Sequence, residues 1–263
     1  MSPTLNKIID YASSHWKSEV GPAYQVKAED YPRILVKVMA DITKGKTLSK
    51  NFVRIAGISG SGKTTQLVPA AEAYYKSRKQ SPVLVAARVF APYHPYYEEI
   101  KTEYGEENIR RHTDEFATIM LFLVLSELVK AGYDIILDVA LLDPSMEQIL
   151  EQMLNAGNYE QLMLAIAVSP EVATKQLEGR NWRHSKSTEE EFVKATTKAL
   201  AFYAENFTNL HIIMWDTFSE NPIYDGKVKG ALPAFEEASA ITDIPPHDEA
   251  TLLERKIAYL SML

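Results

Sequence analysis

Residues 52–64 read FVRIAGISGSGKT, and this stretch decides the fold. An apolar run, Phe52–Ile58, leads into eight residues, Gly57–Thr64, that fit the pattern G-x-x-x-x-G-K-[ST]. A helical pattern, Thr64–Tyr75, follows directly. Glycines let the backbone wrap around phosphate groups with its N–H groups pointing inward, and a helix start adds positive potential. The stretch therefore predicts a loop that binds the phosphates of a nucleotide.

The residue types of this loop predict how ATP and Mg²⁺ are held. We expect Lys63 to reach the β- and γ-phosphates and the Thr64 hydroxyl to hold Mg²⁺. The predicted nucleotide-binding residues are Gly57, Ser59, Gly60, Ser61, Gly62, Lys63, Thr64 and Thr65. The guanine-reading motif N-K-x-D and the switch motif D-x-x-G do not follow Lys63, which favours a small-molecule or nucleotide kinase over a GTPase.

Apolar runs and helical patterns alternate along the chain. Five runs read as parallel strands that are covered on both faces: Phe52–Ile58, Pro82–Ala87, Asp134–Leu141, Gln161–Val168 and Leu210–Trp215. Helix signals lie between them: Thr113 to Gly132, Asp143 and Pro144 to Gly157, Ser169 with Pro170, and Thr188 with Glu191 to Phe207. The alternation predicts an α/β fold of the P-loop NTPase type, with a parallel five-stranded sheet flanked by helices.

Three segments are expected along the chain. Residues 1–50 are predicted to form a helical extension, with one helix over Leu5–Trp16 and another from Asp30, as N-cap, to Gly45. Residues 51–220 are expected to form the P-loop kinase core. Residues 221–263 are rich in turns until a final helix near His247–Leu260, and we expect them to pack on the core.

Composition and charge exclude several kinds of site. The 263-residue chain has no cysteine, which excludes disulfides, thiolate metal sites and a cysteine nucleophile. Its formal charge of -7 becomes -10 once the first 50 residues, with eight basic and five acidic side chains, are set aside. That balance makes nucleic acid an unfavourable partner. The most apolar run, Ile119–Val129, is shorter than the roughly 20 residues that span a bilayer, so we expect a cytoplasmic protein without membrane contact.

A basic segment follows the fourth predicted strand. Arg180, Arg183, His184 and Lys186 lie within seven residues, between two predicted helices. In small kinases a mobile arginine-rich lid occupies this place, and its guanidinium groups stabilise the transferred phosphoryl group. Arg180 and Arg183 are therefore candidate catalytic residues. The alternative is a solvated turn that balances the acidic run Glu189–Glu191.

Asp138 stands near the carboxyl end of the third predicted strand. Ligands of open parallel sheets bind at such ends. A carboxylate there is a candidate for holding Mg²⁺ through water, or for taking the proton from an attacking hydroxyl. The alternative is a strand-end carboxylate that caps a nearby backbone group.

The order of these motifs, from about Phe52 to Trp215, resembles the zeta toxin family of P-loop kinases. After the loop comes Val89–Tyr97, VFAPYHPYY, which is similar to the family's phenylalanine followed by a His-Pro-x-aromatic segment. Arg111-His112-Thr113 then precedes a long helix, and Val139–Pro144, VALLDP, resembles the family's stretch after the strand-three acid. The resemblance implies ATP-dependent phosphorylation of a sugar hydroxyl on a nucleotide sugar, typically UDP-N-acetylglucosamine.

Carried over by position, the resemblance assigns further residues. His94, with Pro95, shapes the substrate cleft, Thr113 and Asp138 are candidate substrate residues, and Arg180 and Arg183 neutralise the γ-phosphate. Trp215-Asp216-Thr217 falls where related kinases hold the adenine ring. The family's helical antitoxin implies an antitoxin-like protein partner, or inhibition in cis by residues 1–50.

Arg88 is the main departure from the family, which has a catalytic aspartate at this position, two residues before the phenylalanine. An arginine cannot accept the proton because its guanidinium is always charged. Three outcomes stay open: Asp138 serves as the base, Arg88 binds a more anionic substrate, or the protein binds nucleotide without transferring phosphate. A kinase of nucleic-acid 5′ ends is a further alternative, which the acidic core disfavours.

Overall fold

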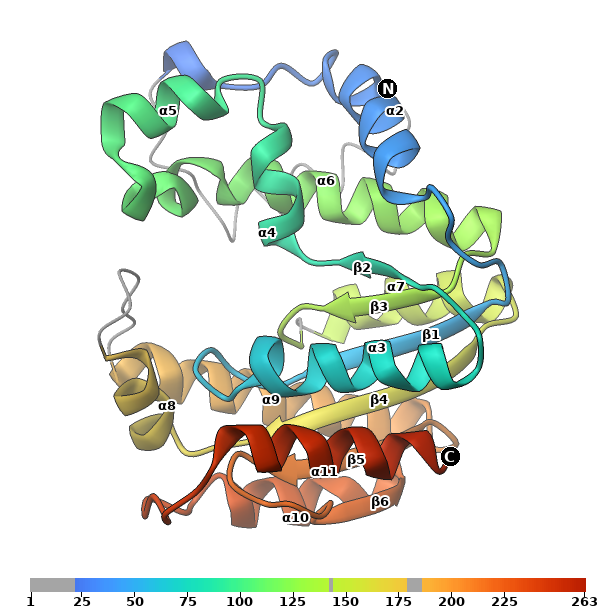
Figure 1. Ribbon diagram of the computed structural model, residues 1–263, viewed down its shortest axis with the longest axis vertical. Helices are drawn as coiled ribbons and strands as arrows, with labels where there is room; N and C mark the ends of the chain where they lie inside the picture. Colours follow the sequence, from blue (N-terminus) through green and yellow to red (C-terminus); the bar gives the residue numbers. More distant parts are fainter. Residues whose placement is uncertain (1–21, 142–143, 179–185) are drawn as a thin grey trace.

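The computed structural model describes residues 22–141, 144–178 and 186–263, and these contain a six-stranded sheet (Figure 1). The strands lie in the order β2-β3-β1-β4-β5-β6. Their bounds are β1 (Asn51–Ala56), β2 (Val83–Val85), β3 (Ile135–Asp138), β4 (Glu160–Ala167), β5 (His211–Asp216) and β6 (Tyr224–Lys227). β1 to β5 pair in parallel, as the apolar runs predict.

The predicted count of five strands is wrong, because β6 adds an antiparallel edge strand to β5. Its sequence, Tyr-Asp-Gly-Lys, alternates half-buried and exposed positions and contains no apolar run. An edge strand with one solvent-exposed face needs little apolar surface, so a search for continuous apolar runs could not detect it.

The register of the sheet brings the carboxyl ends of β1 and β3 together. Ile55 of β1 lies opposite Asp138 of β3, and Ala56 lies opposite Ala165 of β4. Gly57 follows Ala56 directly, so the glycine-rich loop and the Asp138 carboxylate emerge at the same edge of the sheet. β2 is shorter than predicted because the chain turns into the short helix α4 (Ala87–Phe90).

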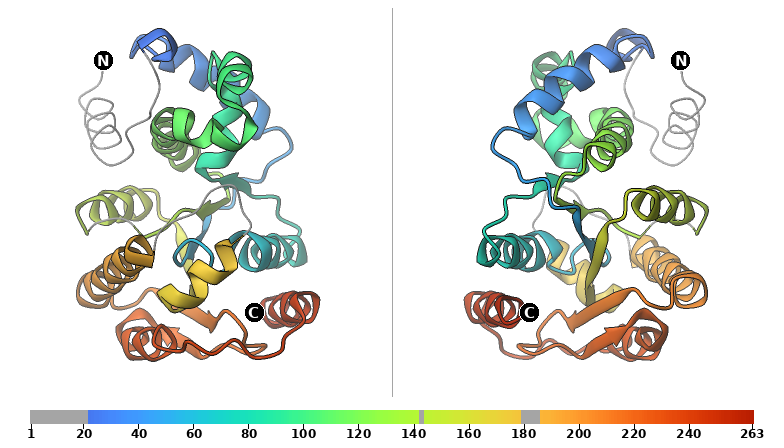
Figure 2. Two further views of the ribbon diagram at one scale, coloured as in Figure 1. Left: turned by 90° about the vertical axis from the view of Figure 1, so that its left-hand side faces the viewer. Right: turned by 90° about the vertical axis from the view of Figure 1, so that its right-hand side faces the viewer.

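Helices cover both faces of the sheet (Figures 1 and 2). On one face, α3 (Val68–Ser77) and α11 (Glu249–Ser261) pack around the buried side chains of Ile55, Leu67 and Trp215. On the other face, α9 (Lys186–Asn206) and α10 (Ala231–Ala238) pack on β4 and β5 around Tyr203 and Phe235. The remaining core helices are α7 (Pro144–Ala156) and α8 (Pro170–Leu177). The parallel strands are therefore buried on both sides, which explains their continuous apolar runs.

A helical layer stands beyond the β2 edge of the sheet (Figure 1). It contains α2 (Tyr31–Ile42), α4, α5 (Tyr97–Tyr104) and α6 (Ile109–Ala131). Tyr31 of α2 stacks on Phe116 of α6 with ring centroids 5.7 Å apart. The second helix of the predicted extension is thus confirmed and packs on α6, whereas the helix predicted over Leu5–Trp16 lies outside the described residues.

The observed starts of the helices can be compared with the capping residues that the sequence predicts. Ser169 caps α8 as predicted, since its hydroxyl accepts a hydrogen bond from the Val172 N–H at 3.3 Å. The predicted start at Thr113 is wrong: α6 begins four residues earlier, and the Thr113 hydroxyl donates to the Ile109 carbonyl at 2.9 Å. α9 begins at Lys186, before the predicted cap at Thr188, and Asp30 makes no side-chain cap bond to α2. Capping residue types also occur inside helices, where a threonine hydroxyl can bond back one turn.

The C-terminal helix starts close to its predicted position. Asp248 accepts hydrogen bonds from the backbone N–H groups of Ala250 and Thr251, and α11 follows it. Across the described ranges, no helix combines the length and the apolar character that crossing a membrane requires.

Candidate nucleotide site

The loop after β1 has the backbone shape that its glycines predict. Gly57, Gly60 and Gly62 have φ values of 141°, 76° and 94°, a region that side chains disfavour. A Cβ atom at Gly60 would lie 2.5 Å from the Ala173 carbonyl oxygen, and one at Gly57 would lie 2.8 Å from that of Ile166. These positions therefore require glycine for both conformation and space.

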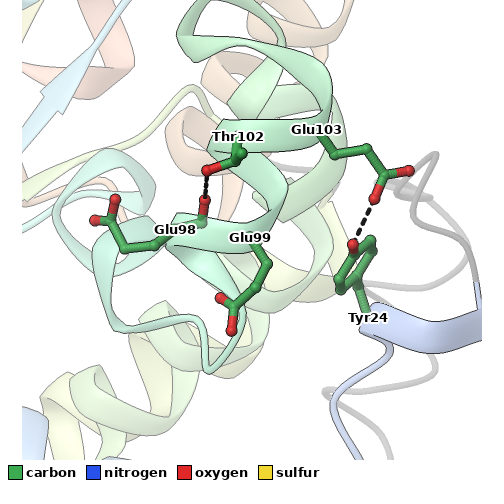
Figure 3. A pocket seen from close by; sticks show the side chains of 5 residues that line it. All are labelled: Tyr24, Glu98, Glu99, Thr102 and Glu103. Atoms are coloured by element: carbon green, nitrogen blue, oxygen red, sulfur yellow. Dashed lines mark hydrogen bonds between the residues drawn. The ribbon is translucent and has the colours of Figure 1, made fainter.

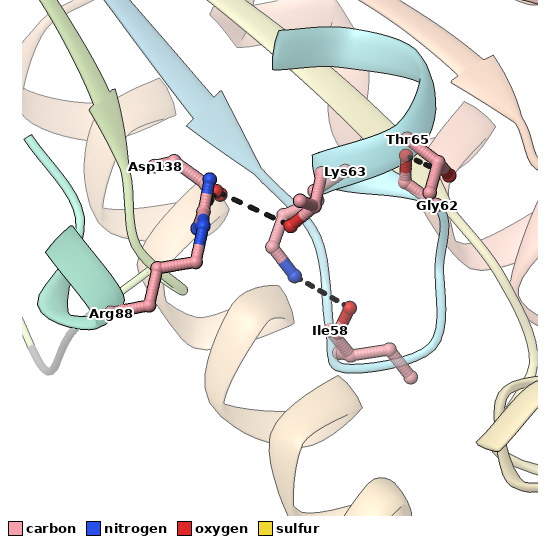
Figure 4. A network of polar contacts seen from close by, with 7 residues as sticks. Ile58, Gly62, Lys63, Thr65, Arg88 and Asp138 are labelled. Carbon is pink, nitrogen blue, oxygen red and sulfur yellow. Dashed lines mark hydrogen bonds and ion pairs between the residues drawn. The ribbon is translucent and has the colours of Figure 1, made fainter. Parts of the chain in front are cut away.

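Lys63 opens a π-helical turn, η2 (Lys63–Leu67), and its side chain folds back over the loop (Figure 4). Its Nζ donates a hydrogen bond to the Ile58 carbonyl oxygen at 2.7 Å. Burial lowers the pKa of Lys63 to about 8, while the charges of Asp138 and Glu189 oppose that shift. The ammonium group is thus held inside the loop, where a bound phosphate would meet it.

Thr64 and Asp138 lie close enough to serve one cation. The Thr64 hydroxyl is 3.5 Å from Oδ2 of Asp138, a residue that is almost fully buried. A hydroxyl and a carboxylate oxygen suit a hard cation such as Mg²⁺, so the residues present fit the predicted metal. The described residues contain no group of three or more His, Asp or Glu side chains that could hold a metal.

Arg88 points at the same carboxylate from the other side (Figure 4). Its guanidinium nitrogen lies 2.5 Å from Oδ2 of Asp138, and its side chain is 39% exposed. The helix α4, which interrupts the predicted end of β2, carries Arg88 to this position. Asp138 is therefore already paired, and it cannot act as a free base while this contact persists.

The segment after β5 is hydrogen-bonded to the phosphate loop. The Thr217 hydroxyl donates to the Ser61 carbonyl at 3.2 Å, and the Gln66 side-chain amide donates to the Thr217 carbonyl at 3.4 Å. Lys256 of α11 is fully buried and donates to the Ser219 carbonyl at 2.9 Å. Sequence reasoning missed Lys256, because a single lysine in a C-terminal helix carries no motif. The expected adenine region is thus anchored from two sides.

His94 and Thr113, two predicted substrate residues, are buried in the helical layer. His94 accepts a hydrogen bond from the Tyr96 N–H at 3.2 Å and packs edge-on against Phe116, with centroids 4.9 Å apart. Burial lowers the pKa of His94 to about 4, so its ring is neutral at pH 7. The Thr113 hydroxyl is occupied by its own helix. The described contacts give both residues packing roles, and their substrate roles stay predictions.

Glu189 in the first turn of α9 is a buried carboxylate that sequence reasoning missed and that acts electrostatically on Lys63. It is 0% exposed, and neither carboxylate oxygen has a hydrogen-bond partner among the described residues. Burial raises its pKa to about 7, and the nearby Lys63 opposes that rise. Helical spacing from buried Thr196 and Tyr203 could have revealed that Glu189 faces inward. The predicted lid arginines, Arg180 and Arg183, lie outside the described residues.

A separate hollow of about 610 Å³ lies on the helical layer (Figure 3). Its lining comprises Tyr24, Glu98, Glu99, Thr102 and Glu103. The Tyr24 hydroxyl donates a hydrogen bond to Glu103, which raises the pKa of Tyr24 to about 12 and lowers that of Glu103. Three carboxylates repel phosphate groups, so this hollow is a poor site for a nucleotide, and the glycine-rich loop stays the candidate.

Comparison with known proteins places the chain in a family. A model of the zeta toxin family matches residues 38–229, which is more than half of the chain. The chain belongs to the zeta toxin family. The match contains the phosphate loop, Arg88, Asp138 and Glu189, and it confirms the resemblance inferred from the motifs.

This zeta toxin family member is similar in sequence to a curated protein. Toxin PezT of Streptococcus pneumoniae serotype 4 (strain ATCC BAA-334 / TIGR4) is 27% identical over 146 residues, which are 55% of this chain and 56% of PezT. The match thus spans about half the length of that curated relative.

Solved structures confirm the fold. A structure of the PezAT chromosomal toxin-antitoxin system of Streptococcus pneumoniae has a TM-score of 0.65 and 20% identity, covering 91% of this chain and 99% of that chain. A structure of AvrRxo1-ORF1:AvrRxo1-ORF2 with sulphate ions has a TM-score of 0.54 and 11% identity, covering 92% of each chain. At such identities the likeness shows the fold alone, which is the predicted P-loop α/β fold with six strands instead of five.

Proposed function

We propose that this zeta toxin family member is an ATP-dependent phosphotransferase that moves the γ-phosphate to a hydroxyl of a small acceptor. The observation that carries the proposal is the glycine-rich loop with Lys63 inside it and Thr64 beside Asp138. A loose phosphoryl-transfer transition state asks mainly for positioning and positive charge, which Lys63 and the predicted lid arginines Arg180 and Arg183 supply.

Mg²⁺, when bound, would neutralise charge on the β- and γ-phosphates, with Thr64 and Asp138 as its protein contacts. The chain's own residues do the remaining work. Backbone N–H groups of the loop bind the phosphates, and Lys63 orients the γ-phosphate. Asp138 is the default base of this proposal, and Arg88 must release it before it takes the proton of the acceptor hydroxyl.

The family favours a nucleotide sugar such as UDP-N-acetylglucosamine as the acceptor. The relatives also support an antitoxin-like protein partner, since solved neighbours are named as a toxin-antitoxin system and as an ORF1:ORF2 complex. The alternative to a separate partner is inhibition in cis by residues 1–50. The described helix of that segment, α2, packs on α6. A cytoplasmic location agrees with both alternatives.

A second candidate function is nucleotide binding without phosphate transfer. Arg88 favours it, because a guanidinium occupies the position of the family's catalytic aspartate and pairs with Asp138 at 2.5 Å. A polynucleotide 5′-hydroxyl kinase is less favoured, because residues 51–263 carry a net charge of -10.

Transfer from labelled ATP tests these functions. The full chain is incubated with Mg²⁺ and a panel of nucleotide sugars, sugar phosphates and oligonucleotides, and Lys63→Ala serves as the loss-of-function control. We expect a phosphorylated nucleotide sugar, with Lys63→Ala slower by about 10²–10³-fold. ATP binding without any product would support the second function, and absence of ATP binding would overturn both.

Arg88→Ala separates two roles of Arg88 within the phosphotransferase. If the Arg88–Asp138 pair only restrains the base, removal of Arg88 raises the transfer rate, and Asp138→Asn then abolishes the gain. If Arg88 binds an anionic acceptor, Arg88→Ala instead raises the KM of that acceptor and leaves the KM of ATP unchanged.

A further inference from the structure

Glu189 has an unusual environment for a carboxylate. It lies in the first turn of α9, while its neighbours Glu190 and Glu191 are exposed to solvent. Glu189 itself is 0% exposed, and neither of its oxygens receives a hydrogen bond from the described residues. Burial of a polar group without hydrogen bonds is costly, so this position needs a physical explanation.

Lys63 is the charged group that acts on Glu189. The two groups influence each other in both directions, since the charge of Glu189 stabilises the ammonium form of Lys63 and Lys63 stabilises the carboxylate. No hydrogen bond joins them, because the Lys63 Nζ donates to the Ile58 carbonyl instead. The other charged groups that act on Lys63 are Asp138 and Arg88, which pair with each other at 2.5 Å.

This arrangement conflicts with a bound triphosphate. In a phosphate loop of this type the lysine contacts the β- and γ-phosphates, so the γ-phosphate brings up to two negative charges toward Lys63. Repulsion between like charges is strong in a buried site, where water screens little. The carboxylate of Glu189 and the γ-phosphate therefore compete for one ammonium group.

We propose that Glu189 is a positioning residue that acts through Lys63: it supplies the counter-charge of the lysine in the empty loop and gives way to the γ-phosphate of ATP. This proposal rests on the proposed function. Because ADP lacks the γ-phosphate, the charge of Glu189 opposes ATP more than ADP. Glu189 thus sets the preference of the site between the two nucleotides, and it links nucleotide binding to the first turn of α9.

Calorimetric titration of the full chain with ATP and with ADP, both with Mg²⁺ at pH 7.5, where both side chains are mainly charged, tests the proposal. In Glu189→Gln we expect ATP to bind about tenfold more tightly, whereas ADP changes less than twofold. Glu190→Gln, an exposed neighbour on the same turn, is the matched control and is expected to leave both affinities unchanged. Glu189→Met repeats the test with an uncharged side chain of similar length, in case the first variant misfolds.

The ratio of the two affinities is decisive, because a merely structural role of Glu189 would change both nucleotides alike. Equal changes for ATP and ADP, or no change in either, would overturn the proposal. In that case loss of ATP binding in Lys63→Ala would leave the proposed function intact. If wild type, Glu189→Gln and Glu189→Met all fail to bind ATP, the proposed function and this inference are both wrong.

Discussion

Glu147 and Glu189 are both fully buried, and they differ in what surrounds them. Glu147 of α7 accepts a hydrogen bond from Arg54 of β1 at 2.6 Å and another from the Tyr203 hydroxyl of α9 at 2.6 Å. These contacts join a central strand to two helices. Glu189 has a lysine within electrostatic reach but no hydrogen-bond donor among the described residues.

The comparison separates a carboxylate that serves the fold from one that serves the site. A buried charge whose oxygens are all paired contributes to a unique packing arrangement. A buried charge without donors costs stability, and such costs occur where a protein keeps space for a ligand. Glu147 belongs to the first kind and Glu189 to the second, although both lie on helices that flank one sheet.

The largest expected effect comes from breaking the paired carboxylate. Glu147→Ala leaves the guanidinium of Arg54 buried without its partner, and its side chain is only 3% exposed. We expect the free energy of unfolding to fall by about 3–5 kcal/mol, measured by urea denaturation. Glu190→Ala, on an exposed position, should change it by less than about 0.5 kcal/mol. A loss below about 1 kcal/mol in Glu147→Ala would show that the pair is not a structural anchor.

Removing the unpaired carboxylate of Glu189 should raise the free energy of unfolding instead of lowering it. The pKa of Glu189 rises from 4.5 to about 7 on folding, so wild type loses stability as the pH rises through this window. The amide that replaces the carboxyl group in Glu189→Gln does not titrate. The free energy of unfolding of Glu189→Gln should therefore equal that of wild type near pH 4.5 and exceed it by about 2 kcal/mol above pH 7. Part of the gain is offset there, because Lys63 loses a counter-charge.

Thermal and urea denaturation of Glu189→Gln between pH 4.5 and 8 measure this difference. A variant that is less stable than wild type at pH 8 would contradict the assignment of Glu189 as an unsatisfied charge. A difference that does not depend on pH would show that titration of Glu189 is not its origin.

The smallest expected effect sharpens the description of the paired carboxylate. Tyr203→Phe removes one of the two hydrogen bonds to Glu147 and leaves the ion pair with Arg54 in place. We expect a loss of about 1.5 kcal/mol in urea denaturation, which is typical for a hydrogen bond to a charged group. A loss as large as that of Glu147→Ala would mean that the hydroxyl, and not Arg54, holds the carboxylate.

Much of the fold follows from local patterns. The apolar runs predict the five parallel strands because burial on both faces requires continuous apolar sequence. The edge strand β6 and the short helix α4 escape this reasoning, since neither has an apolar run or a clear period. Thr113 shows a different error of the sequence prediction. It is a residue type that often caps helices, so it is expected to start the helix, but it lies inside α6.

The candidate site divides in the same way. Lys63 and Thr64 are predicted by a motif, because a phosphate loop takes its expected ligand contacts from neighbouring residues of the chain. Asp138 is predicted from its strand end, but its pairing with Arg88 depends on the turn of the chain into α4. Glu189 and Lys256 carry no motif, and they reach the site only because α9 and α11 pack beside the loop and the segment that follows β5.

The sequence alone determined the phosphate loop, the parallel sheet and the family, because each rests on contacts between residues close in the chain or on repeated apolar patterns. Tertiary structure decided which charges meet. The partners of Asp138, Lys63 and Glu147 come from elements far apart in sequence, and their distances follow from the packing of helices on the sheet. Electrostatic interactions depend on distance and burial, which no local pattern encodes.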